Sequence, residues 1–546
     1  MYFYFGRDGE TLRFISQKYH LELKDLLAFN PHIQSPDLII AGRKINIPST
    51  AVPLRQTVLP PCPPEEPPDY LDHWIPLTSL EKMQQTDYDV LIVGSGAGGG
   101  AVLWRLCERW GRNGKRIGMV EAGDLLLPTH ARNIPTMSNR RLENYLLSPK
   151  VSKPLPQFPG AKQIFALGGR TLFWGAFSPR MYDAEMQKWP IPVEEIRFYY
   201  NIAEQIMNVT SAYTKGSSIT QLLLQRLREN GFPEAMDVPM AVDLESTQYG
   251  QIHSNVFFSS FHLLASSLNL RPFDLAVKAR AVQVLTDRGK AVGVKVMSPD
   301  KRSYVIKAKT IVLSASTFET PRLLLYSGIR GPAIGRYLVN HSFVRAKGMI
   351  SRQEFPEVLG TLKILIPQTE ARPFQIEIHG PGTFDWYQPF EQKPLREQWE
   401  IILYGFGKVE PRFENRVYLD PRRRDEYGVP EIQIDFAYSQ NDKAVILHIA
   451  EGMKQTFSAM RVPFNSIGSA PICLQPVGEV FHDMGTCRMG DDPLTSATDR
   501  YGQIHGVSGL YVADSSILVT VGAANPALTT VAMALRTADH ILHQLK

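Results

Sequence analysis

Three glycines with the spacing of a phosphate-binding turn directly follow an apolar run. The run is Val90–Val93, and Gly94, Gly96 and Gly99 fit the pattern G-x-G-x-x-G. In such a turn the first glycine permits a tight bend, the second lets the backbone approach a pyrophosphate, and the third lets the next helix pack close to the strand. The helix start then offers unpaired N–H groups and a partial positive charge to phosphates. These residues predict a dinucleotide site.

A strand, a helix and a second strand are needed to hold this turn, and the sequence predicts them in that order. Residues 101–110 form the expected helix, and the segment KRIGMVEAG forms the second strand, which ends at Glu121. A carboxylate at that place can accept a hydrogen bond from a ribose 2′-hydroxyl and would repel a 2′-phosphate, which disfavours NADP. The pattern leaves FAD and NAD open, and a ligand-free glycine turn is the alternative.

Length and charge limit the classes of function. A chain of 546 residues has room for several domains, and its net charge of +5 is small for that length. The densest basic run, Arg422–Arg424, is flanked by acidic residues and favours a solvated turn over a nucleic-acid patch. No stretch approaches the ~18 apolar residues that indicate a spanning helix. We therefore expect a protein that contacts neither nucleic acid nor the membrane interior.

The cysteines and histidines show no metal-binding pattern. Cys62, Cys107, Cys473 and Cys487 form no C-x-x-C pair, and His540 and His543 are more simply explained as cations near a helix C-terminus. We predict no metal site. The first residues, MYFYFGRDGE, have neither a basic n-region nor a long apolar core, so we expect no ordinary signal peptide and a cytoplasmic location.

Residues 1–49 have a pattern of their own: a strand, two short helices and a closing strand. This βααβ order resembles the LysM module, a binder of glycans that contain N-acetylglucosamine. The resemblance implies peptidoglycan or chitin as a partner and association with an envelope or coat, in conflict with the missing signal peptide. The alternative is a small cap without a ligand. The resemblance is carried by Gly9–Leu12, Ile15, Tyr19, Leu26, Asn30, Pro31, Ile39, Gly42 and Ile45–Pro48.

Residues 50–69 are predicted to be a linker. Eight prolines stand between Pro48 and Pro68, a density that prevents helix or central strand and favours semi-rigid polyproline II. The third predicted part, residues 70–546, contains all of the chemistry-bearing motifs.

Two C-terminal segments carry the most specific resemblance. The segments FHDMGTCRMG and VGAANPALTT closely resemble the glucose-methanol-choline (GMC) oxidoreductases, and the likeness extends over most of residues 85–546. It implies an α/β fold with a three-layer, Rossmann-like FAD-binding domain and an antiparallel-sheet substrate domain. The FAD-binding parts are expected at about 85–180, 255–345 and 475–546, and the substrate domain at about 181–254 and 346–474. The dinucleotide is then FAD.

The resemblance also assigns residues to the cofactor. FALGGRTLFWGAF matches the family's glycine-glycine loop over the flavin, and LAVKARAVQV matches the strand that passes the adenine. The implied contacts outside the opening turn and Glu121 are Gly168, Gly169, Thr171, Trp174, Gly175, Ala176, Val277, Asp514, Pro526 and Thr529.

The family's catalytic pair falls on His482 and Asn525. Alcohol oxidation removes a hydroxyl proton and transfers a hydride from the same carbon to flavin N5. A neutral imidazole can take that proton near physiological pH, and an amide can orient the substrate oxygen without titrating. Considered without this motif, His482 would be interpreted as a histidine with a structural role.

Two positions depart from the family pattern. Ser316 stands where the family has glycine, and Phe173 stands where some relatives carry a flavin-linking histidine. We therefore expect non-covalent FAD. The C-terminal pattern is nearest to the pyranose oxidase and gluconate dehydrogenase branch, which favours a sugar or polyol substrate. Two other classes stay open: a non-redox flavin lyase of the same fold, and a wall- or coat-associated structural flavoprotein.

Overall fold

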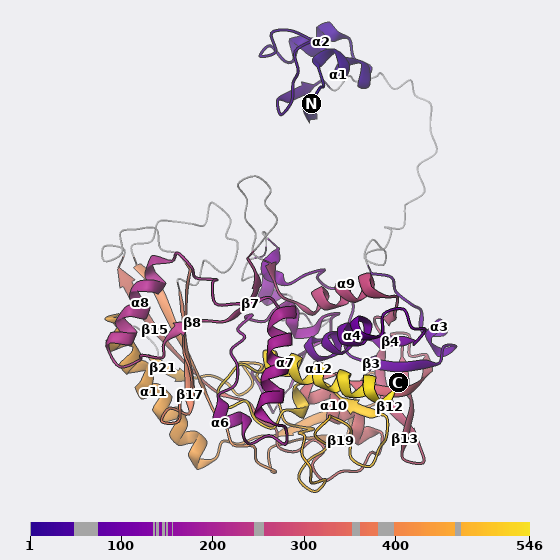
Figure 1. The fold of residues 1–546 in the computed structure, drawn as a ribbon, viewed down its shortest axis with the longest axis vertical. Coiled ribbons are helices and arrows are strands. Elements are labelled where there is room, and N and C mark those ends of the chain that lie inside the picture. The colour runs from indigo at the N-terminus through magenta and orange to yellow at the C-terminus, as the bar shows by residue number, and fades with distance from the viewer. Residues whose placement is uncertain are drawn as a thin grey trace. The chain divides into compact units, whose positions relative to one another are not determined.

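The computed structural model divides into two compact units, Met1–Tyr70 and Leu71–Lys546, shown in Figure 1. The predicted linker lies outside the described residues. Those are 2–48, 75–134, 137, 141–144, 148, 151–155, 157–244, 256–351, 361–380, 398–464 and 471–546.

The smaller unit has the predicted βααβ order. Strands β1 (Tyr2–Phe5) and β2 (Lys44–Ile47) pair antiparallel, and helices α1 (Leu12–Lys18) and α2 (Leu23–Ala28) lie between them in the chain. Apolar residues from all parts of this unit form its core: Leu12, Ile15, Leu26, Ile33, Ile40, Ile45 and Ile47.

Two polar side chains fix the ends of these helices. The hydroxyl of Thr11 accepts from the amide of Phe14 and caps α1. The buried amide of Asn30 donates to the carbonyls of Leu26 and Asn46 and accepts from the Asn46 N–H. Asn30 thereby links the end of α2 to β2. The smaller unit thus has its own apolar core and its own stabilising hydrogen bonds.

The larger unit contains a seven-stranded sheet in the order β11-β4-β3-β14-β13-β12, with β22 also beside β14. Its parallel part joins strands that lie far apart in the sequence. They are β3 (Tyr88–Val93), β4 (Ile117–Val120), β11 (Asp274–Ala276), β14 (Ser303–Leu313) and β22 (Leu510–Val512). Strands β12 (Arg280–Asp287) and β13 (Lys290–Met297) form an antiparallel meander with β14. This arrangement confirms the predicted α/β class.

Helices α4 (Ala97–Trp110), α9 (Ser260–Leu270) and α12 (Pro526–Gln544) pack together, and α10 (Ser316–Tyr326) packs on the meander. The predicted first helix began at residue 101, so its start is corrected to Ala97. Gly98, Gly99 and Gly100 are helical although glycine disfavours helix interiors. A Cβ at Gly98 would overlap the carbonyl of Ala513, so close packing explains the glycine there.

A six-stranded sheet forms the second part of the larger unit. Its order is β21 (Ile472–Leu474), β15 (Ser342–Ser351), β18 (Gln398–Gly407), β17 (Phe374–Gly380), β16 (Leu362–Ile366) and β8 (Met236–Asp237), all antiparallel. Helices α8 (Ser218–Glu229) and α11 (Gln440–Met460) cover one face of it, as Figure 1 shows. This is the expected substrate-domain sheet.

The remaining elements connect these layers. They are α3 (Leu80–Gln84), η2 (Ala131–Asn133), β5 (Ser152–Pro154), β6 (Lys162–Ile164), η3 (Gly169–Leu172), α6 (Asp183–Met186), α7 (Val193–Ile206), β7 (Val209–Thr210), β9 (Met240–Asp243), β10 (Val256–Phe257), β19 (Arg416–Arg424), β20 (Pro430–Asp435) and η5 (Ser515–Ile517).

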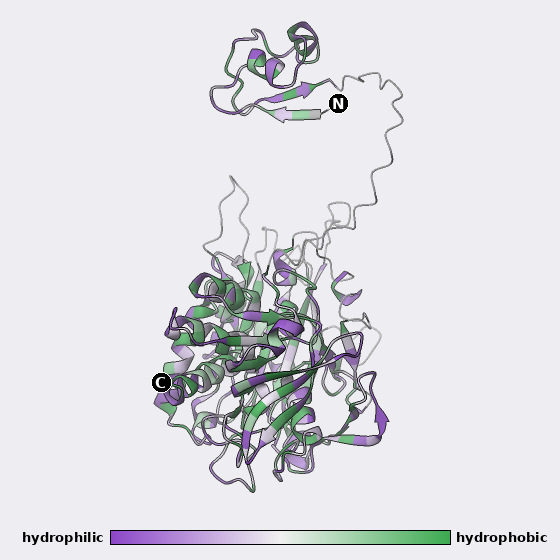
Figure 2. Cartoon of the chain, turned by 90° about the vertical axis from the view of Figure 1, so that its right-hand side faces the viewer, coloured by the Kyte–Doolittle hydropathy of each residue, from purple (hydrophilic) through white to green (hydrophobic). Residues whose placement is uncertain are grey.

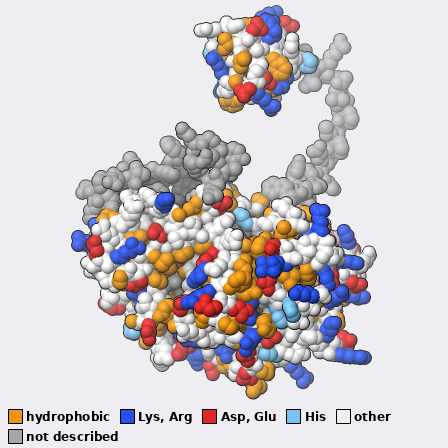
Figure 3. Space-filling view, viewed as in Figure 1, with side chains coloured by type: hydrophobic (Ala, Val, Ile, Leu, Met, Phe, Trp, Pro, Cys, Tyr) orange, Lys and Arg blue, Asp and Glu red, His pale blue; other side chains and the backbone are white. Residues whose placement is uncertain are grey.

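The surface agrees with the small net charge. Hydrophobic residues run through the helices and strands of the larger unit (Figure 2), and acidic and basic side chains are interspersed over the face in Figure 3. The run Arg422–Arg424 forms the exposed end of β19, so it is solvated as expected but is strand rather than turn.

Candidate active site

A cavity of about 380 Å³ in the larger unit brings the two informative ends of the sequence together. The glycine turn and Glu121 line one part of it, and His482, Asp514 and Asn525 line another. Residues 169–171 and 173–175 of the glycine-glycine loop also face it. A cavity shared by a dinucleotide fingerprint and a histidine–asparagine pair is the expected shape of a cofactor-dependent active site.

The three glycines of the opening turn are explained in three different ways. Gly94 has φ +98°, a left-handed conformation that favours glycine. A Cβ at Gly99 would overlap the Gly94 carbonyl oxygen, so Gly99 sets the close contact between α4 and β3. Gly96 is the N-cap of α4 with φ −65°, and a Cβ there would meet nothing within 4 Å. Nothing in the protein therefore requires glycine at position 96, which leaves a ligand as the reason.

The Glu121 carboxylate fixes the conformation of the glycine turn through hydrogen bonds. It accepts from the Ser95 N–H at 3.0 Å, the Ser95 hydroxyl at 2.7 Å and the Gly123 N–H at 2.8 Å. An ionised carboxylate has about four acceptor sites, so one remains for a ribose hydroxyl. Burial raises the pKa of Glu121, an effect that these three hydrogen bonds oppose. Glu121 thus braces the turn as well as facing the cavity.

The glycine-glycine loop is held against this turn by small polar groups. The Ser95 hydroxyl accepts from the Gly168 N–H at 2.9 Å, and the Thr171 hydroxyl donates to the Gly168 carbonyl at 2.6 Å. Gly168 and Gly169 have φ values of +89° and +53°, and Ala176 has +64°. A Cβ at Gly169 would lie 3.6 Å from the Cα of Gly96, so the two chains face each other closely.

Four donors hold the Asp514 side chain. Its Oδ1 accepts from the N–H and the hydroxyl of Ser516, and its Oδ2 accepts from the Ser316 N–H at 2.9 Å and the Thr320 hydroxyl at 2.6 Å. These four donors fill the acceptor sites of the carboxylate. Asp514 lines the cavity, but its side chain serves to fix the start of α10 and of η5.

Ser316 stands where the resemblance expected glycine, and it has φ +86°. This left-handed conformation is the physical reason for glycine in the family pattern. The hydrogen bond from the Ser316 N–H to Asp514 helps to hold the strained residue.

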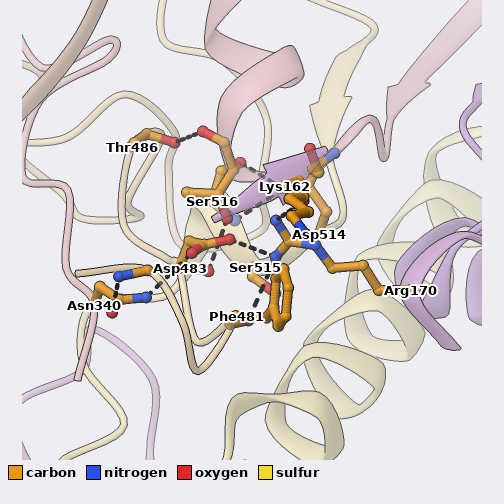
Figure 4. A network of polar contacts seen from close by, with 12 residues as sticks. Lys162, Arg170, Asn340, Phe481, Asp483, Thr486, Asp514, Ser515 and Ser516 are labelled. Carbon is orange, nitrogen blue, oxygen red and sulfur yellow. Dashed lines mark hydrogen bonds and ion pairs between the residues drawn. The ribbon is translucent and has the colours of Figure 1, made fainter. Parts of the chain in front are cut away.

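The residues beside His482 are fixed by a buried carboxylate, drawn in Figure 4. Asp483 forms an ion pair with Arg170 of the glycine-glycine loop and accepts from the Asn340 amide at 3.1 Å. Its carbonyl accepts from the Thr317 hydroxyl at 2.8 Å. Arg170 also donates to the carbonyls of Phe481 at 3.4 Å and Lys162 at 3.0 Å. Asp483 therefore joins the backbone of His482 to three separate segments.

The two expected catalytic residues lie side by side. Asn525 is the N-cap of α12, and its Nδ2 lies 3.4 Å from Nε2 of His482. On the other side of the imidazole, Nδ1 of His482 lies 3.0 Å from Nδ1 of His341. Burial, together with His341 and Arg170, lowers the pKa of His482 well below its usual value. Burial lowers the pKa of His341 to about 4. Both imidazoles are therefore neutral near pH 7.

Most, but not all, of the residues named from the sequence line the cavity. Those that do are Gly94, Gly96, Glu121, Gly169, Thr171, Trp174, Gly175, His482, Asp514, Asn525 and Pro526. Those that are not among its lining residues are Gly99, Gly168, Ala176, Val277 and Thr529. The Thr529 hydroxyl lies 2.7 Å from that of Tyr200.

Sequence reasoning missed an ionic cluster at the cavity wall. Arg280 and Arg322 both pair with Glu319, which is held ionised because the two guanidinium groups lower its pKa to about 2 against the effect of burial. The three side chains are buried and line the cavity. The spacing of Glu319 and Arg322 on one helix face was a usable signal.

Phe173 lines the cavity, and among the described residues that do so His482 is the only histidine. His130 lies nearby, but its Nε2 pairs with the Trp174 carbonyl and its Nδ1 accepts from the Arg132 N–H. Within the described part of the chain, no group of three or more His, Cys, Asp or Glu is placed to hold a metal ion. The helices described there include none long and apolar enough to cross a membrane.

Comparison with known families agrees with both units. Residues 161–343 and 411–534 match the N- and C-terminal models of GMC oxidoreductase, and residues 7–48 match the LysM domain.

Comparison with individual proteins finds distant relatives. A C-glycoside 3-oxidase of Arthrobacter globiformis is 29% identical over 71% of this chain and 76% of its own length. A 2-methyl-1,2-propanediol dehydrogenase of Mycolicibacterium austroafricanum is 26% identical over 83% and 95%, and a pyranose 2-oxidase of Tricholoma matsutake is 22% identical over 71% and 74%. The crystal structure of pyridoxine 4-oxidase from Mesorbium loti shares the fold, with a TM-score of 0.60 at 15% identity, over 84% of this chain and 99% of that one.

Proposed function

This chain belongs to the GMC oxidoreductase family and is an FAD-dependent oxidoreductase, and we propose that it oxidises a hydroxyl group of a sugar or polyol. The observation that carries the proposal is the single cavity in which His482 and Asn525 face the space beside the glycine turn. Relatives named for C-glycoside, pyranose and diol substrates favour polyhydroxylated compounds.

The residues around the cavity fit FAD. Gly96 leaves space for a pyrophosphate beside the start of α4, where backbone N–H groups are unpaired. Glu121 keeps one acceptor site for the ribose, and Trp174 and Gly175 line the cavity beside Asn525. Phe173 has no nucleophilic atom, so we propose that FAD is held without a covalent bond; acid precipitation should release it into the supernatant.

His482 is the proposed base. Its neutral Nε2 accepts the hydroxyl proton of the substrate, and the Asn525 amide, 3.4 Å from that nitrogen, orients the hydroxyl oxygen. The bound cofactor supplies the acceptor for the hydride that leaves the same carbon. The substrate would thereby become a carbonyl compound, and its hydroxyl proton would remain on His482.

An anaerobic screen of alcohols and sugars for bleaching of the flavin absorbance tests this proposal. His482→Ala should bind FAD normally and slow bleaching by about 10²–10⁴, the usual loss for a general base. His448→Ala, at an exposed position on α11, is the matched control and should bleach at the wild-type rate. Bleaching of His482→Ala at the wild-type rate would remove the histidine from the mechanism.

We further propose that the LysM domain binds a glycan that contains N-acetylglucosamine and so places the enzyme at a wall or coat. The support is the match at residues 7–48 and the separate core of this unit. The full chain should sediment with peptidoglycan or chitin, whereas a chain lacking residues 1–69 should keep FAD and turnover but stay in the supernatant. Equal sedimentation of the two would contradict the anchoring role.

A further inference from the structure

The face of the six-stranded sheet opposite α8 and α11 carries a row of buried polar side chains. Gln375, Glu377 and His379 alternate along β17 with residues that point into the apolar core, so all three share one face. Lys363 on β16 stands directly opposite His379 in the register. Lys363, Gln375 and Glu377 are at most 2% exposed. Burial of polar and charged groups costs free energy unless they form hydrogen bonds. We infer that these buried side chains have a specific role.

Lys363 determines which atoms donate and which accept hydrogen bonds along this row. Its ammonium group has donors and no acceptor, and it lies 3.0 Å from Nδ1 of His379. Nδ1 is therefore the acceptor, and the His379 proton is on Nε2. That nitrogen lies 3.1 Å from Oε2 of Glu377 and donates to it.

The same direction continues to the catalytic pair. The Gln375 Nε2 donates to Oε1 of Glu377 at 3.2 Å and to Oδ1 of Asn525 at 2.9 Å. Since Oδ1 of Asn525 faces Gln375, its Nδ2 faces Nε2 of His482 at 3.4 Å and donates to it. Nε2 of His482 then holds a lone pair, and its proton lies on Nδ1, which donates to Nδ1 of His341 at 3.0 Å.

We propose that Gln375 and Glu377 are positioning residues that fix the Asn525 amide and thereby the His482 tautomer with an unprotonated Nε2. At one end of this hydrogen-bond chain, Lys363 and His379 determine which atoms donate and which accept. At the other end, the Nδ1–H of His482 donates to His341. The proposal rests on His482 as the base, because only then does the identity of the protonated nitrogen control the rate.

The first test reads the tautomer and needs no substrate. In holoenzyme labelled with ¹⁵N-histidine, two-bond ¹H–¹⁵N correlation separates the two tautomers, and loss of a signal in His482→Asn assigns it. Wild type should show the Nδ1–H form of His482, and Gln375→Met should show a mixture of both forms. A wild-type Nε2–H form, or an unchanged Nδ1–H form in Gln375→Met, would overturn the proposal.

The second test reads the rate of anaerobic flavin reduction. The probe is whichever of D-glucose, D-sorbitol and 2-methyl-1,2-propanediol bleaches wild type. Gln375→Met should reduce the limiting rate by about 10²-fold, the order of loss that a misplaced reacting group produces, with little change in KM. Gln433→Met removes a buried glutamine amide on β20 that pairs with Gln157, and it should keep the wild-type rate.

The Gln375→Glu substitution changes the pH dependence of activity only if residue 375 positions Asn525, and so separates that role from a purely structural one. A protonated carboxyl can donate to Oδ1 of Asn525, whereas a carboxylate cannot, so Gln375→Glu made in the Glu377→Gln background should lose activity as pH rises, relative to Glu377→Gln alone. The same pH dependence in the double variant and in Glu377→Gln would contradict the proposal. If His482→Ala slows reduction and Gln375→Met does not, only this inference fails. If His482→Ala has no effect, the proposed function fails.

Discussion

Replacing Gly96 by alanine should separate cofactor binding from folding. The residue has an extended, negative-φ conformation that alanine adopts readily, and the new methyl group would meet no protein atom within 4 Å. The apoprotein should therefore unfold at the wild-type temperature or slightly above it, because Gly→Ala at a compatible site stabilises by about 0.4–1 kcal/mol. The methyl group would instead occupy space that the pyrophosphate needs.

The size of the loss follows from overpacking. Forcing an extra methyl group into a packed contact costs about 1–3 kcal/mol, so the Kd for FAD should rise by about 5- to 150-fold. Calorimetric unfolding of the apoprotein and titration with FAD measure the two quantities. Gly99→Ala is the contrasting variant, because its methyl group would overlap the Gly94 carbonyl and should destabilise the apoprotein itself. Unchanged FAD affinity of Gly96→Ala, or apoprotein as unstable as that of Gly99→Ala, would refute this reading of the turn.

Three further predictions concern backbone strain and the pH dependence of the rate. Ser316→Gly should stabilise the apoprotein by up to about 1.5 kcal/mol in urea unfolding, since relief of a left-handed residue gains ~1–2 kcal/mol and glycine costs ~0.5–1 kcal/mol, whereas Ser316→Val should destabilise it; destabilisation by both substitutions would count against strain at φ +86°. The lowered pKa of His482 means that flavin reduction should show no inflection near pH 6.5, although an ordinary imidazole is about three-quarters protonated at pH 6. Burial raises the pKa of Glu377 to about 8, so the rate should fall as pH drops through that value, and Glu377→Gln should abolish this limb. Groups facing Glu377 come from β16, β17, β18 and α12, namely Lys363, His379, Tyr404 and Asn525.

The sequence predicted the site correctly where all the residues that determine its geometry lie in one short segment. The strand, glycines and second strand around Gly94 and Glu121 are contiguous, so their geometry follows from short-range rules. The helix start was misplaced because Gly98–Gly100 have poor helix propensity, and the carbonyl of Ala513 that requires a small residue belongs to a distant segment.

The polar chain behind Asn525 shows the opposite case. Gln375, Glu377 and His379 alternate with apolar residues in the sequence, a pattern typical of a strand with one polar face. That this face meets Asn525 depends on pairing between strands and on where α12 starts, neither of which a local pattern contains. The hydrogen bonds of Asp514 were hidden from the sequence for a related reason, because its four donors come from two segments.

The parallel sheet has a consequence for synthesis on the ribosome. Strand β22 inserts beside β14, and Asn525 at the start of α12 completes the cavity wall, whereas the glycine turn emerges several hundred residues earlier. The nascent chain thus exposes its phosphate-binding turn long before the rest of the cavity exists. Tight loading with cofactor must therefore wait until the segment around Asn525 has left the ribosome, and a product that ends before β22 would lack this part of the cavity wall.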